Sequence, residues 1–67
     1  MSDARASEIE RLTAEHVALT RQQYDALQKS PYARMPKSEA EAYDKRLFRI
    51  IEIHRQLAKF RDEGASP

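Results

Sequence analysis

The sequence predicts an all-α fold: an antiparallel two-helix hairpin that dimerises into a four-helix bundle or coiled coil. Two segments with apolar residues at helical spacing each open with Ser-x-x-Glu, at Ser7 and at Ser38. In this motif the serine and glutamate side chains accept hydrogen bonds from backbone N–H groups of the first turn, so it is typical of a helix start. A short segment containing Pro31 and Pro36 separates the two helices, which we therefore expect to run antiparallel.

The 67 residues are too few for more than one domain. We expect the first helix to end before Ser30, because Pro31 disfavours a helical conformation at the preceding residue. The only glycine, Gly64, follows the last apolar positions and is expected to terminate the second helix. The predicted boundaries are helix 1 at about 7–29, a loop at 30–37, helix 2 at about 38–62 and a frayed tail at 63–67.

The first helix is expected to bury one broad face. In a heptad interpretation, the a and d positions are Ile9, Leu12, His16, Leu19, Gln23 and Ala26. A second stripe that widens this face consists of Thr13, Val17, Thr20, Tyr24 and Leu27.

The second helix has a wider apolar surface than one partner helix covers. Its central stripe follows 4-3-4-3 spacing, and we expect Ile50 and Leu57 to be among the most buried residues. The apolar residues that flank this stripe would stay exposed in a monomer, which predicts self-association. The predicted protein interface consists of Tyr43, Leu47, Phe48, Ile50, Ile51, Ile53, His54, Leu57 and Phe60.

The loop carries two large side chains, Tyr32 and Met35. The first interpretation is that they close the open end of the bundle. The alternative is a recognition loop, because loops carry binding residues more often than cores do.

The two histidines, His16 and His54, both fall within apolar stripes and are roughly level in an antiparallel pair. Three interpretations stay open: core or boundary residues that fix the packing register, a pH-sensitive packing element, and a metal site across the hairpin. The first is preferred, so no metal and no cofactor is predicted. Neither histidine has a nucleophile at a suitable helical spacing, so no catalytic residue is predicted either.

The segment Arg11-Leu12-Thr13-Ala14-Glu15-His16-Val17-Ala18-Leu19 is similar to the L-x-x-E-H-x-x-L pattern in the first helix of the YdcH-like family, which comprises small bacterial helical hairpins of uncharacterised function. Lys45-Arg46-Leu47, followed by Glu52-Ile53, resembles the K-x-L…E-I pattern of the second helix. The family's Lys-rich centre of that helix is absent, since Phe48-Arg49-Ile50-Ile51 stands there, and the loop differs. The resemblance covers about half of the chain and implies a helical hairpin.

The predicted function is a non-catalytic protein-interaction or adaptor module that self-associates through helix 2. The expected partner is a second copy, or another protein, with no membrane and no small-molecule substrate. No apolar run reaches the length of a membrane span and no signal peptide is evident, so a cytoplasmic location is expected.

The alternative function is that of a small nucleic-acid-associated regulator. The chain carries no cysteine and a net charge of +1, but basic residues outnumber acidic ones in the second helix. A solvated helix surface explains this excess, and a phosphate-binding strip is the other interpretation. The candidate nucleic-acid contacts are Lys45, Arg49, Arg55 and Lys59.

Overall fold

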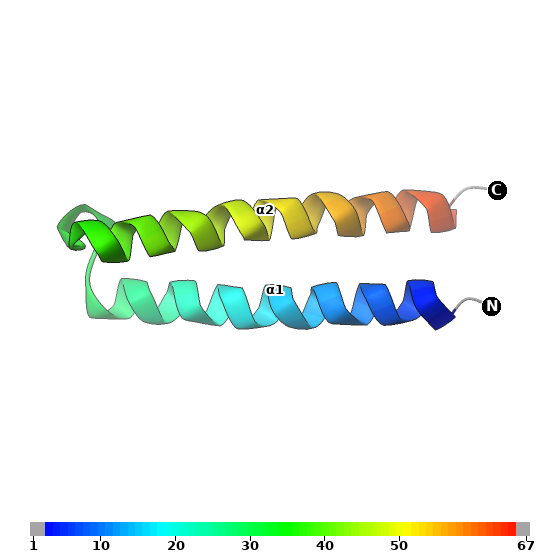
Figure 1. The fold of residues 1–67 in the computed structure, drawn as a ribbon, viewed down its shortest axis with the longest axis horizontal. Helices are drawn as coiled ribbons and strands as arrows, with labels where there is room; N and C mark the ends of the chain where they lie inside the picture. Colours follow the sequence, from blue (N-terminus) through cyan, green and yellow to red (C-terminus); the bar gives the residue numbers. More distant parts are fainter. Residues whose placement is uncertain (1–2, 66–67) are drawn as a thin grey trace.

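The computed structural model describes residues 3–65, which form two long helices joined by a short connection (Figure 1). Helix α1 spans Asp3–Lys29, the 3-10 turn η1 spans Tyr32–Arg34, and helix α2 spans Lys37–Ala65. The helices lie side by side and run in opposite directions, so Asp3 and Ala65 lie at the same end of the molecule. The predicted all-α antiparallel hairpin is confirmed.

The first helix begins earlier than the sequence predicts, because its first turns are anchored on α2. The guanidinium Nη2 of Arg5 donates a hydrogen bond of 2.7 Å to the backbone carbonyl of Phe60, and its Cζ lies 5.7 Å from the centre of the Phe60 ring. Ala4 and Ala6 beside it have high helix propensity. Ser7 therefore lies inside α1, and the capping box predicted there is wrong.

The second helix also differs from its predicted bounds. The N–H of Ala40 donates to the carbonyl of Pro36 at 2.9 Å, so Ser38 lies within the first turn and not at the cap. At the other end α2 continues through Gly64 to Ala65, so the predicted stop at Gly64 and the frayed tail from residue 63 are wrong. Glu63 extends the contact with α1, since its carboxylate lies 3.6 Å from Arg5. Residues 66–67 of the predicted tail lie outside the described residues.

The core of the hairpin is narrow. Among the described residues, Leu12 of α1 and Ile53 of α2 are the two fully buried hydrophobic side chains. Ile50 and Leu57, which were predicted to be most buried, are only half-buried. The face of α2 that meets α1 is therefore rotated from the predicted stripe and is centred on Ile53.

Two arginines of α2 lie beside this rotated face, where α1 offers each of them a polar partner. Gln23 is 8% exposed; its Nε2 donates to the carbonyl of Tyr43 at 3.0 Å and its Oε1 accepts from Arg46 Nε at 2.6 Å. Nearer the middle, Arg49 Nε and Nη2 donate to the two carboxylate oxygens of Glu15 at 2.6 and 2.8 Å. These bonds satisfy polar groups that lie between the helices.

The loop end of the hairpin is closed by Tyr32. Its hydroxyl donates to the carboxylate of Asp44, with oxygen distances of 2.9 and 3.0 Å, and its ring centre lies 5.4 Å from that of Tyr43. The hydrogen bond to Asp44 raises the pKa of the Tyr32 hydroxyl above its ordinary value. Tyr32, which is 45% exposed, therefore holds the connection against α2, and closure of a bundle end by Tyr32 and Met35 stays a prediction.

Candidate interaction face

A single hairpin leaves much of its surface in water. It measures 48 × 17 × 16 Å, and its radius of gyration is 15.1 Å, whereas a compact chain of this length has about 11 Å. It exposes 5417 Å², whereas a compact monomer of its mass exposes about 4,400 Å². The excess is comparable to the ~800 Å² that each partner buries in a standard interface.

The two histidines meet at the seam between the helices. His16 Nε2 and His54 Nε2 lie 2.8 Å apart, and the rings are edge-on, with centres 4.6 Å apart and planes at 76°. At this distance one imidazole donates a hydrogen bond and the other accepts it. His16 is half-buried and His54 is exposed, so the pair lies where the seam opens to solvent.

Large apolar side chains of both helices are exposed around this pair, from its edge to the outer sides of the helices. On α1, Val17 and Tyr24 line a surface hollow together with His16, and Thr20, Arg21 and Asp25 complete its lining. On α2, Leu47 and Ile51 precede His54 at helical spacing on the same side of the helix. We name this surface the histidine face; its members are His16, Val17, Tyr24, Leu27, Leu47, Ile51 and His54.

The exposed fractions show how open this face is. Val17 is 58% exposed, Tyr24 60%, Leu27 43%, Leu47 41% and Ile51 40%. The second stripe of the first helix, Thr13, Val17, Thr20, Tyr24 and Leu27, is exposed throughout in the single hairpin, so α2 does not bury it. Monomeric proteins rarely gather large apolar side chains in this way, so the histidine face is the main candidate for an interaction surface.

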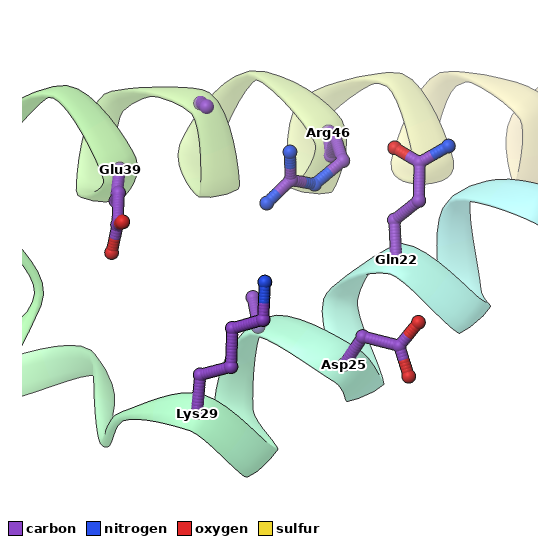
Figure 2. Close-up of a pocket in the computed structure, with 7 residues that line it drawn as sticks. Gln22, Asp25, Lys29, Glu39 and Arg46 are labelled. Atoms are coloured by element: carbon purple, nitrogen blue, oxygen red, sulfur yellow. The ribbon is translucent and has the colours of Figure 1, made fainter.

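The opposite edge of the seam is ionic. Glu15 and Glu52 both accept from Arg49, the latter at 2.7 Å from Nη1, and Glu8 pairs with Arg11. Near the loop this edge widens into a groove, in which Lys29 of α1 and Arg46 of α2 point toward the space between the helices (Figure 2). The groove is also lined by Gln22, Asp25 and Glu39, so charges of both signs surround it.

The predicted interface residues of helix 2 separate into three groups. Ile53 is fully buried against α1, so its prediction as an intermolecular contact is wrong. The half-buried members are Tyr43, Ile50, Leu57 and Phe60. The exposed members are Leu47, Phe48, Ile51 and His54. Of these, Phe48 is 69% exposed and lines a hollow of α2 together with Ile51, at the outer edge of the histidine face.

The predicted nucleic-acid contacts are not a continuous row of free cations. Arg49 is bonded to two carboxylates at the seam. The remaining three, which are exposed on the far side of α2, are Lys45, Arg55 and Lys59. Glu41 and Glu52 share that side at helical spacing, so negative charges interrupt the strip.

We expect the Glu15–Arg49 pair to contribute to the loss of fold stability at acidic pH. The hydrogen bond from Arg49 lowers the pKa of the Glu15 carboxyl below its ordinary value of 4.5. A lowered pKa in the folded state means that the pair stabilises the fold above about pH 4.5 and loses this effect as the pH falls through the folded pKa.

We therefore expect Glu15→Gln to reduce the loss of thermal stability between about pH 5 and pH 3 relative to the parent. The matched control is Glu10→Gln on the exposed side of α1, which should leave the profile unchanged. Melting temperatures measured by circular dichroism across this range decide the outcome. Identical pH profiles for the parent and Glu15→Gln would contradict the assignment.

Comparisons of the chain with models of known protein families, with curated proteins and with solved structures find no match. The resemblance to the YdcH-like family thus stays a prediction from the sequence. Within residues 3–65, no helix is long and apolar enough to cross a membrane.

Proposed function

We propose that the protein is a non-catalytic interaction module in which two copies of the hairpin pack through their histidine faces and form a four-helix bundle. The observation that carries this proposal is that both helices expose large apolar side chains near the histidine seam. The sequence prediction assigned self-association to helix 2 alone, and we now include Val17, Tyr24 and Leu27 of α1 in the contact surface.

The physical basis is the small core of one hairpin. Two fully buried hydrophobic side chains among the described residues are few for a domain of this size, and small domains without staples usually need a partner. Packing two histidine faces together removes five large apolar side chains per chain from water. At ~25 cal/mol per Å² of buried apolar surface, this burial is the largest stabilising free energy that a single hairpin lacks.

The test compares two neighbouring residues that are both exposed. Leu47→Glu places a charge in the centre of the proposed contact, and Phe48→Glu places the same charge on the far side of α2. An unpaired buried charge destabilises by roughly 3 kcal/mol or more, so Leu47→Glu should weaken the dimer by a factor of ~100 or more. Phe48→Glu should leave the dimer intact.

Sedimentation equilibrium at micromolar concentrations measures both variants. The parent should be a dimer, and its melting temperature should rise with protein concentration because folding and assembly are linked. A parent chain that stays monomeric, or equal dissociation constants for the two variants, would overturn the proposal. The nucleic-acid alternative receives less support, because Arg49 is already paired and Glu41 and Glu52 interrupt the basic strip.

A further inference from the structure

The histidine pair joins the two helices through a hydrogen bond between side chains of the same type. His16 Nε2 and His54 Nε2 lie 2.8 Å apart, so one nitrogen carries a hydrogen and the other offers its lone pair. Arg49 and Glu15, by contrast, bond as opposite charges. The histidine contact therefore accommodates one hydrogen between its two Nε2 atoms and not two.

We propose that His16 and His54 form a pH-sensitive contact, which holds the helices together at neutral pH and separates when both imidazoles are protonated. The first added proton leaves the bond intact, because an imidazolium Nε2–H still donates to the neutral ring. The second places a hydrogen on both Nε2 atoms and a positive charge on both rings, so the bond is lost and the rings repel each other. This inference is independent of the proposed self-association, since both residues belong to one chain.

The charges around the pair favour this separation. On both helices, the residues one turn before and one turn after each histidine carry no charge. The other charged or titratable side chains near the pair are Glu15, Arg21, Tyr24 and Asp25 on α1, and Arg55 and Arg61 on α2. Of the two carboxylates, Glu15 is bonded to Arg49, and Asp25 lies about 13 Å further along α1 than His16. Neither histidine is paired with a carboxylate within residues 3–65, so a second positive charge has no counterion.

Separation of the rings affects the core of the hairpin. The two fully buried hydrophobic side chains among the described residues lie beside the pair, since Leu12 is one turn before His16 and Ile53 directly precedes His54. The rings can turn into water, because His54 is exposed and His16 borders a surface hollow. Protonated rings that turn outward leave the core less well covered, so the histidine contact contributes to stability at neutral pH.

The direction of the pH effect follows from the number of protons that each state binds. The unfolded chain takes up two protons as the pH falls through the ordinary histidine range near about 6.5, whereas the folded hairpin keeps its contact with at most one added proton. The folded state then binds fewer protons, so the free energy of unfolding falls as the pH falls below about 6.5. A difference of one proton raises the equilibrium constant for unfolding about tenfold per pH unit. Because solvent screens the repulsion at the open seam, we expect a rise of at least ~3-fold between about pH 6.5 and about pH 5.0.

The experiment measures urea unfolding of the whole chain by circular dichroism at about pH 6.5 and about pH 5.0. Between these values the equilibrium constant for unfolding should rise at least ~3-fold more in the parent than in His16→Gln or His54→Gln. Glutamine takes up no proton, and the histidine that remains has no like charge bonded to it. Ala18→His is the matched control: it adds a third histidine on an exposed side of α1 and should keep the pH dependence of the parent.

NMR titration of the two imidazoles in the folded parent tests the same contact without a variant. The rings should take up their protons in two coupled steps, and loss of the contact should accompany the second step. Equal pH dependence of unfolding in the parent and in both glutamine variants would overturn the proposal. Two rings that titrate independently of each other would overturn it as well.

Discussion

Ile53→Ala should destabilise the protein by ~2–5 kcal/mol, the range for removing a large aliphatic side chain from a packed core. Ile53 is fully buried and packs within the hairpin, where Leu12 is the only other fully buried hydrophobic residue described. Small domains have a free energy of unfolding of only ~5–15 kcal/mol, so this single change removes a large share of it.

Phe48→Ala is the control for this prediction. It removes more carbon atoms than Ile53→Ala does, but from a side chain that is 69% exposed, so the change should stay within about 0.5 kcal/mol. Urea unfolding followed by circular dichroism measures both. Equal losses of stability would show that the core is not centred on Ile53.

Gln23→Met should destabilise the hairpin by ~1–3 kcal/mol, although methionine has a similar shape and is more apolar. The change leaves the carbonyl of Tyr43 and the guanidinium of Arg46 without the partners they have between the helices. A buried polar group that loses its hydrogen-bond partner lowers the free energy of unfolding by an amount of this size.

Gln22→Met provides the matched control, because Gln22 is the same residue type one position earlier and is exposed. It should leave the free energy of unfolding within about 0.5 kcal/mol of the parent. Unfolding curves in urea for the two variants, recorded at equal protein concentration, decide the outcome. A Gln23→Met variant as stable as Gln22→Met would show that the polar seam contributes nothing.

The sequence pattern was sufficient to predict two helices and a hairpin, because both segments have apolar residues at helical spacing. It was not sufficient to predict which face of helix 2 meets helix 1. The apolar pattern includes Leu47 in the predicted interface, whereas in the structure Leu47 is 41% exposed and Arg46 instead reaches between the helices to bond Gln23. This exchange depends on a partner in the other helix, which no local pattern contains.

The predicted start of the first helix was wrong for the same reason, because it too depends on a contact with the other helix. Ser7-x-x-Glu10 is a local signal for a start, but the contact of Arg5 with Phe60 extends the helix beyond it. The two histidines were predicted to be roughly level in an antiparallel pair, and the structure brings their Nε2 atoms within 2.8 Å. The face on which they lie could not be predicted, because it depends on the rotation of α2.

The connection between the helices, residues 30–36, has a consequence for the order of events during folding. So short a segment lowers the entropic cost of loop closure, and the residues of the two helices that meet next to it are close in sequence. Chains with such low contact order fold within microseconds to milliseconds. Encounters between two chains at micromolar concentration are slower, so each newly made chain forms its hairpin, and with it the proposed docking surface, before it meets another copy.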